Sequence, residues 1–317
     1  MRRALPALAA SVVLFLAVPA EAVGQSILVS TADLAGRLND PKLVLLHVGE
    51  KAGYDAAHIA GARFADVRNS LHARTQELNL EMLPPDVLRE RLAALGISDD
   101  LHIVVYHAGG PITLATRLIL TLHWAGLDNV SLLDGGLDAW TREKRPVTTD
   151  VAAPGAGKLS PLKVRPVVAD AEFVQTRLSK PGFAIVDARL PAFYDGTQVG
   201  GSQAARHKAG HIAGALSVPY TTLTTADGLL KSQAELRALF AAAGVKPDDT
   251  VVTYCHIGQQ ATAVLFAARL LGHKVVLYDG SFEDWSRRNL PANSTRLIFG
   301  SEESYHQPGE MTRRTGK

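Results

Sequence analysis

Short apolar runs alternate with longer amphipathic stretches over most of the chain. The apolar runs predict strands near Phe183 to Asp187, Thr250 to Tyr254 and Lys274 to Tyr278. The amphipathic stretches predict helices at 85–95, 112–125, 170–178, 232–243, 260–271 and 282–288, with Ser232 as an N-cap and Gly244 as a stop. This alternation is typical of an α/β fold in which helices cover both faces of a parallel sheet.

The same ordered signs occur twice along the chain. In the first half they are Leu45-Leu46-His47, His58-Ile59-Ala60-Gly61-Ala62, Ile103 to His107, and Leu133-Asp134-Gly135 before Trp140. In the second half they are Ile185-Val186-Asp187, His211-Ile212-Ala213-Gly214-Ala215, Val251 to Cys255, and Tyr278-Asp279-Gly280 before Trp285. The offsets are 140, 153, 148 and 145 residues, and an insertion of 13 residues precedes His211. Four ordered matches indicate two copies of one domain.

The repeat divides the chain into two tandem domains, residues 23–150 and 166–296. Residues 151–165 contain Ala-Ala-Pro-Gly-Ala-Gly, a composition typical of a linker. Residues 297–317 are expected to form a polar tail.

The first 22 residues have the composition of a secretory leader. Arg2 and Arg3 precede an apolar stretch from Ala4 to Ala20, and Ala20-Glu21-Ala22 offers a cleavage site after Ala22. We therefore expect an exported protein, periplasmic or secreted. The apolar stretch is about 17 residues long, at the lower limit for a membrane span, so the alternative is an uncleaved anchor. Contact with a membrane is expected only in that case.

Composition and charge exclude several classes of protein. With 47% apolar and 20% charged residues, the chain is expected to fold into ordinary globular cores rather than remain disordered. The net charge is +2, from 33 basic and 31 acidic residues, which gives no reason to expect nucleic acid as a partner.

Cys255 is the only cysteine of the chain, so no internal disulfide can form. It lies where the predicted strand 250–254 ends, and His256, Ile257, Gly258, Gln259, Gln260 and Ala261 form the following loop and the start of a predicted helix. Backbone N–H groups that converge at a helix N-terminus favour an anion and stabilise a thiolate. The loop contains no lysine or arginine, so these N–H groups are expected to supply most of that stabilisation. We therefore predict that Cys255 is a nucleophile rather than an inert buried thiol.

These residues resemble a known family. The tandem repeat, Asp187-x-Arg189, the two His-Ile-x-Gly-Ala segments, the Tyr-Cys-x-x-Gly loop and the two Asp-Gly…Trp segments resemble a two-domain rhodanese-type sulfurtransferase over about residues 28 to 296. The resemblance implies an inactive N-terminal domain, in which His107 stands where Cys255 stands in the second copy. It also implies a persulfide on Cys255, which accepts sulfur from thiosulfate or a related donor and passes it to cyanide or a thiol. Neither a metal nor an organic cofactor is then needed.

Two departures from the family pattern bear on the sulfur donor. Thiosulfate-using relatives carry a cation two places after the cysteine and an arginine before the tyrosine of the second copy, whereas this chain has Ile257 and Phe193. His256, Arg206, His207 and Lys208 are alternative sources of positive charge near the site. A non-enzymatic persulfide carrier or redox interaction module, loaded by a protein partner, therefore remains an alternative function.

Single residues bear on the other functions and roles that the sequence allows. A phosphatase of the Cys-x5-Arg type is disfavoured because Ala261 occupies the position of its arginine. Asp187 and Arg189 form either an ordinary ion pair or a support for the active loop, and Asp134 and Asp279 are expected to cap the turns that follow them. His58 and His211 are expected to be structural. A metal site at His102, His107 and His123 is a weak alternative, because these residues lack paired spacing.

Overall fold

The computed structural model describes residues 26–75, 78–151, 155–202 and 206–294. The predicted leader at 1–22 and the predicted polar tail at 297–317 lie outside the described residues. Among the described helices, none is long and apolar enough to cross a lipid bilayer.

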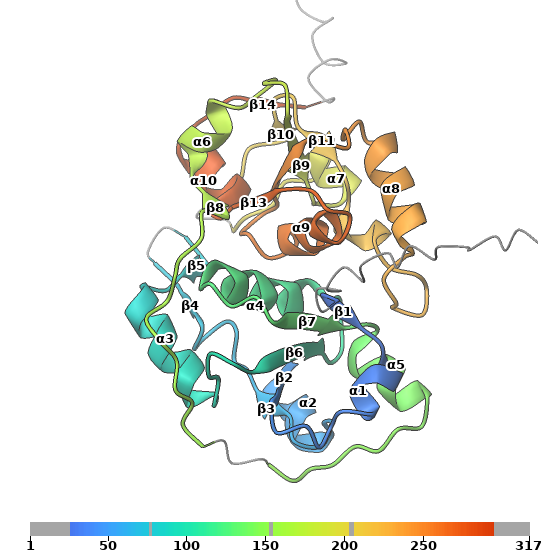
Figure 1. Ribbon diagram of the computed structural model, residues 1–317. Helices are drawn as coiled ribbons and strands as arrows, with labels where there is room; N and C mark the ends of the chain where they lie inside the picture. The colour runs from blue at the N-terminus through green and yellow to red at the C-terminus, as the bar shows by residue number, and fades with distance from the viewer. Residues whose placement is uncertain (1–25, 76–77, 152–154, 203–205, 295–317) are drawn as a thin grey trace, which may run out of the picture.

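The first domain is built on one parallel five-stranded sheet (Figure 1). Its elements are β1 (Leu28–Val29), α1 (Thr31–Ala35), β2 (Leu43–Val48), α2 (Lys51–Ala56), β3 (Arg63–Phe64), β4 (His72–Ala73), β5 (Glu81–Met82), α3 (Pro85–Ala94), β6 (His102–His107), α4 (Thr113–Trp124), β7 (Val130–Leu133) and α5 (Gly136–Arg142). The strand order is β1-β7-β6-β2-β3, and the short strands β4 and β5 form a separate antiparallel pair.

The second domain repeats this plan. Its elements are β8 (Val168–Ala169), α6 (Ala171–Gln175), β9 (Phe183–Asp187), α7 (Pro191–Tyr194), β10 (His211–Ile212), β11 (Leu216–Ser217), the 3-10 turn η1 (Tyr220–Thr222), α8 (Gln233–Ala242), β12 (Thr250–Tyr254), α9 (Ala261–Leu270), β13 (Val275–Tyr278), α10 (Ser281–Arg287) and β14 (Ala292–Asn293). The order β8-β13-β12-β9-β11 matches that of the first sheet strand for strand. The predicted fold of two tandem α/β domains is confirmed.

The predicted elements agree with the structure to within a few residues. The strands at Phe183–Asp187 and Thr250–Tyr254 have the predicted bounds, because buried apolar runs and polar ends mark them clearly. Helix α8 begins after Ser232, whose side chain accepts a hydrogen bond from the Glu235 N–H in a capping box. The largest difference is α6, which ends at Gln175 rather than at 178.

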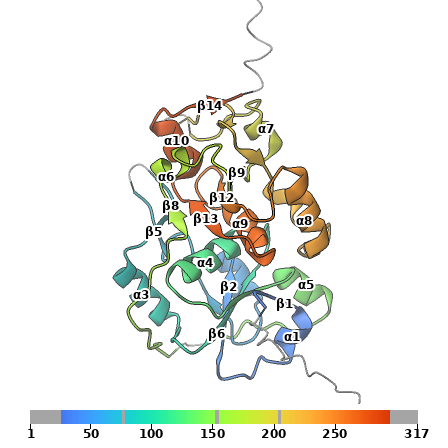
Figure 2. The ribbon, with the colours of Figure 1, turned by 45° about the horizontal axis from the view of Figure 1, so that its top comes forward.

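Helices α4 and α9 pack against each other between the two sheets (Figures 1 and 2). Each follows the central strand of its domain, β6 or β12, and both strands are almost wholly buried. The loop after β6 leads into α4, and the loop after β12 leads into α9. Because these two helices pack on each other, both loops lie at the junction of the two domains.

His58 and His211 have the expected structural role in both domains. Each ring forms a hydrogen bond with the backbone carbonyl of an earlier tyrosine. His58 Nδ1 lies 2.7 Å from the Tyr54 carbonyl oxygen, and His211 Nδ1 lies 2.8 Å from the Tyr194 carbonyl oxygen. Each ring also stacks on the same tyrosine, with centroids 3.9 and 3.7 Å apart.

Candidate active site

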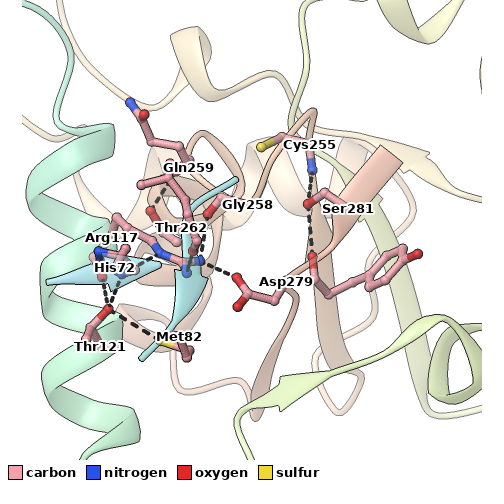
Figure 3. A network of polar contacts seen from close by, with 12 residues as sticks. His72, Met82, Arg117, Thr121, Cys255, Gly258, Gln259, Thr262, Asp279 and Ser281 are labelled. Atoms are coloured by element: carbon pink, nitrogen blue, oxygen red, sulfur yellow. Dashed lines mark hydrogen bonds and ion pairs between the residues drawn. The ribbon is translucent and has the colours of Figure 1, made fainter. Parts of the chain in front are cut away.

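Cys255 directly follows β12 and is held by the start of α10. Its N–H donates to Ser281 Oγ (3.2 Å), and its carbonyl accepts from the Phe282 N–H (3.0 Å). Ser281 Oγ in turn donates to the Tyr278 carbonyl, as Figure 3 shows. The backbone of Cys255 is therefore fixed by the turn between β13 and α10. The side chain is 0% exposed, so a donor reaches the sulfur only after neighbouring side chains move.

The loop after Cys255 presents unpaired backbone donors. The N–H groups of residues 256 to 261 have no acceptor among the described residues, the Cys255 sulfur included. Gln260 precedes α9 with helical backbone angles and provides no side-chain cap, and its Oε1 is buried without a partner. Ala261 is the first residue of α9 and is fully buried. Unsatisfied N–H groups at the start of a helix favour an anion bound there.

Arg189 lies two residues beyond the end of β9 and is a buried basic residue of the second domain. It forms a two-pronged ion pair with Asp187 at the end of β9, with Nη2 to Oδ2 at 2.6 Å, and both side chains are buried. Its guanidinium carbon lies 4.0 Å from the centre of the Phe282 ring. Burial opposes the charge, but Asp187, followed by Tyr254 and Cys255, raises the pKa of Arg189 above its ordinary value. The expectation that the backbone N–H groups of the loop supply most of the stabilisation of the thiolate stays a prediction.

His256 and His207 do not supply the positive charge considered for them. Their Nδ1 atoms lie 3.5 Å apart, and the His256 ring packs edge-on against Phe193 at 4.6 Å. Burial, followed by the repulsion of Arg189, lowers the pKa of each histidine to about 4, so both rings are neutral at pH 7. Lys208 is also engaged elsewhere, because its Nζ donates to the Leu290 carbonyl (2.7 Å).

A buried arginine of the first domain supports the active loop across the junction (Figure 3). Arg117 in α4 is 0% exposed and donates from Nη1 to the Gly258 carbonyl (3.2 Å) and to Asp279 Oδ1 (2.5 Å). It also contacts the Leu80 carbonyl and His72 Nε2. The expectation that Asp279 caps the turn that follows it was wrong, because α10 has no side-chain cap and the Asp279 carboxylate pairs with a residue 162 positions away.

Gly258 occupies a position that only glycine fits. Its φ is +76°, and a Cβ there would lie 2.8 Å from the Asp279 carbonyl oxygen and 3.1 Å from Arg117 Nη1. The left-handed backbone turns the Gly258 carbonyl toward the arginine. Its glycine identity therefore follows from both the turn and the junction between the domains.

Gln259 links the loop to the first domain through both ends of its amide. Its Nε2 donates to Thr113 Oγ1 (3.0 Å), and its Oε1 accepts from Arg68 Nη2 (3.1 Å). Ile257 and Gln259 line a cleft of about 430 Å³, whose other wall includes Arg68, Asn69, Arg74 and Asn79. The active loop thus faces a cavity that the two domains share.

Comparison with known proteins decides the family. The family model described as "Rhodanese-like domain" matches this chain twice, at residues 30–143 and 170–288. The chain belongs to the rhodanese family.

Curated relatives cover nearly the whole of both domains. The thiosulfate sulfurtransferase of Azotobacter vinelandii is 30% identical over 82% of this chain and 93% of its own length. A probable 3-mercaptopyruvate sulfurtransferase of Pseudomonas aeruginosa is 33% identical over 81% of this chain and 94% of its own. A sulfur carrier protein of Thermus thermophilus is 31% identical over 82% of this chain and 93% of its own. The prediction that this rhodanese is a sulfurtransferase is confirmed.

A solved structure supports the fold. The anaerobic ergothioneine biosynthesis enzyme from Chlorobium limicola superposes with a TM-score of 0.76 at 20% sequence identity, over 84% of this chain and 70% of that one. At this identity the similarity shows that the two chains share the fold.

The N-terminal rhodanese domain has neither the thiol nor the ion pair that occur at Cys255. His107 ends β6 at the place of the cysteine, and burial lowers its pKa. His47 and Gly49 stand at the places of Asp187 and Arg189. The Asp187–Arg189 pair therefore occurs only in the domain that carries the thiol, which favours a role in supporting the active loop.

Arg117 is the residue of this rhodanese site that sequence reasoning missed. The signal was present, because Arg117 is the one charged residue in the otherwise apolar or neutral run of α4 from Thr113 to Leu122. Its partners lie in other elements, so the sequence alone could not name them. The histidines considered for a metal do not come together: His102 pairs with Ser131, and no metal-binding group of three side chains occurs among the described residues.

Proposed function

We propose that this protein transfers sulfane sulfur from thiosulfate, or from a related donor, to cyanide or a thiol through a persulfide on Cys255. One observation carries the proposal: the single cysteine follows the central strand of one domain, beside unpaired loop N–H groups and the Asp187–Arg189 pair, and the sister domain has neither the cysteine nor the ion pair. The curated relatives that act on thiosulfate and 3-mercaptopyruvate support sulfur transfer and leave the donor to experiment.

The proposed cycle has two displacements. The Cys255 thiolate attacks the outer sulfur of thiosulfate, the bond between the two donor sulfurs breaks, and sulfite leaves with the electron pair. Cys255 then carries a persulfide anion. Cyanide or a thiolate attacks the terminal sulfur, the sulfur–sulfur bond of the persulfide breaks, and the Cys255 thiolate is restored. No metal or organic cofactor takes part in these steps.

Burial of Cys255 fits a persulfide intermediate better than a freely exposed thiol would. Water and competing oxidants reach a persulfide at the surface, whereas a covered site limits side reactions. The unpaired N–H groups at 256–261 are suited to stabilise the terminal persulfide sulfur, which carries the negative charge.

A persulfide carrier is the second candidate. A relative named as a sulfur carrier favours it, as does the active loop, in which residues 256–261 include no lysine or arginine to hold a small anionic donor. A carrier would accept sulfur from a protein partner and would load slowly with thiosulfate. We also propose that the protein is exported, with the leader removed after Ala22; N-terminal sequencing of protein from the native host tests this.

The decisive experiment measures persulfide formation and turnover separately. The protein lacking residues 1–22 is mixed with thiosulfate, and intact mass reports the addition of one sulfur atom; thiocyanate formation is then followed after cyanide is added. An enzyme loads and turns over, and Cys255→Ser does neither. Loading without turnover identifies a carrier, and equal loading of Cys255→Ser excludes Cys255 as the sulfur-bearing residue.

A further inference from the structure

Residues 78–82 of the first domain, which include β5, dock on the second domain. Figures 1 and 2 show β5 beside β8, the first strand of that domain. Asn79 Nδ2 donates to the Glu283 carboxylate (3.1 Å), and the Leu80 carbonyl accepts from Arg117. Leu80 is buried with a φ of +58°, a conformation that a residue with a side chain keeps only where its surroundings hold it. This docking segment is therefore fixed by contacts with both domains.

Glu81 carries an acid from the docking segment into a cluster of other acids. It lines a cavity of about 440 Å³ together with Asp170, Asp279 and Asp284 of the second domain. Its Oε1 is buried and has no hydrogen-bond partner among the described residues. A buried carboxylate oxygen without a donor is costly, because burial removes its water and nothing replaces it.

The acids that face Glu81 all have partners of their own. These partners are Arg117 for Asp279, Tyr278 and Arg288 for Asp284, Asn79 and Arg287 for Glu283, and the Phe173 N–H for Asp170. On the paired strand β4, His72 stays neutral because burial lowers its pKa to about 3. The positive groups of the cluster are thus engaged elsewhere, and Glu81 is surrounded by carboxylates.

This environment favours the protonated form of Glu81. Burial, followed by repulsion from Asp279, raises its pKa from 4.5 to about 7; Arg117 opposes this shift, and Asp284 and Glu283 add to it. In an undocked segment, Glu81 would meet water and titrate near its ordinary value of 4.5. The docked segment therefore binds more protons between these two values, and its docking weakens as pH rises from 4.5 to about 7.

We infer that Glu81 is a pH-sensitive switch between the two domains: its protonated form keeps residues 78–82 docked, and its ionised form repels the segment from Asp279 and Asp284. Arg117 connects this switch to the loop after Cys255, because it donates both to the Leu80 carbonyl and to the Gly258 carbonyl. Asn79 and Leu80 also line the cleft that Ile257 and Gln259 face. The switch therefore makes the shape of that cleft depend on pH.

Hydrogen exchange of the amides at 78–82, measured without any sulfur compound, tests the switch. The wild type and Glu81→Gln are compared at each pH, so the intrinsic pH dependence of exchange cancels. Between about pH 5.5 and 8, exchange in the wild type is expected to rise about tenfold relative to Glu81→Gln, because only the wild type gains a charge at residue 81. Glu90→Gln, which removes an exposed acid of α3, is expected to behave as the wild type.

Titration of the Glu81 carboxyl by carbon-13 NMR gives a second measurement on the wild type, with a midpoint expected near 7. A midpoint near 4.5, or equal exchange at 78–82 in the wild type and Glu81→Gln over the whole range, overturns the inference. Neither measurement involves Cys255. Failure of the switch therefore leaves the persulfide mechanism standing, and failure of that mechanism leaves the switch standing.

Discussion

Arg117→Met should disconnect the active loop from the first domain. The substitution preserves an apolar stem of similar length in α4 but removes every hydrogen bond to Gly258, Asp279 and Leu80. Arg117 is 0% exposed and Asp279 is 5% exposed. The substitution would therefore leave the Asp279 carboxylate buried between the domains without its ion-pair partner. The main effect is therefore expected on both stability and the shape of the loop.

The expected magnitude follows from the burial of this pair. Removing one partner of a buried ion pair lowers the free energy of unfolding by about 3 to 5 kcal/mol, and each unsatisfied carbonyl adds about 1 kcal/mol or more. These effects share one site and do not add in full. We expect a loss of about 4 kcal/mol for Arg117→Met, whereas Arg117→Met combined with Asp279→Asn should recover part of it, because no unpaired charge remains.

Urea unfolding followed by circular dichroism measures this difference, with Arg91→Met as an exposed control. Persulfide formation on Cys255 is measured in the same samples at urea concentrations where each variant is still folded. Folded Arg117→Met is expected to load more slowly than the wild type. A loss below about 1 kcal/mol together with wild-type loading would show that Arg117 neither stabilises the junction nor positions the loop.

Further predictions concern the loop and its surroundings. Gly258→Ala should lower stability by about 2 kcal/mol or more and slow persulfide formation, because φ is +76° and a Cβ meets the Asp279 carbonyl; urea unfolding and intact mass test this, and an unchanged protein would contradict it. Asp187→Asn should leave the buried Arg189 charge unpaired and lower the free energy of unfolding by about 3 kcal/mol, whereas Asp138→Asn, at an acid without an ion-pair partner among the described residues, should have little effect. The pKa values of His207 and His256 are lowered to about 4 from 6.5, so the unfolded chain binds more protons between these values and stability should fall as pH falls from 6.5 to 4; His207→Gln should reduce this slope in urea unfolding at a series of pH values, and an unaltered slope would contradict the assignment.

Local patterns predicted the fold because they coincide with burial. The runs at 183–187 and 250–254 are apolar, and Ser232 with Glu235 marks the start of α8 unambiguously. Cys255 and Gly258 were also accessible to sequence reasoning, since a single thiol at a strand end and a glycine in a tight loop each have a local cause. These features depend on neighbours within a few residues.

Interactions between distant segments were not predictable in the same way. Arg117 and Asp279 are separated by 162 positions, and neither one's own surroundings name the other. His207 and His256 were considered as cations, but their charge depends on burial and on Arg189, which only the folded arrangement brings near. The loop at 256–261 therefore stays a predicted site, and the structure adds the contacts from distant segments that surround it.

The back-to-back packing of α4 and α9 has a consequence for how such a chain can change. The domain without a cysteine still lines the cleft beside Ile257 and Gln259, so substitutions in it can alter that cleft without changing Cys255. An isolated second domain would keep its thiol yet expose the side of α9 that packs on α4 and lose the first-domain wall of the cleft. In this duplication, the copy without a cysteine can diversify at the shared cleft while its sister keeps the thiol.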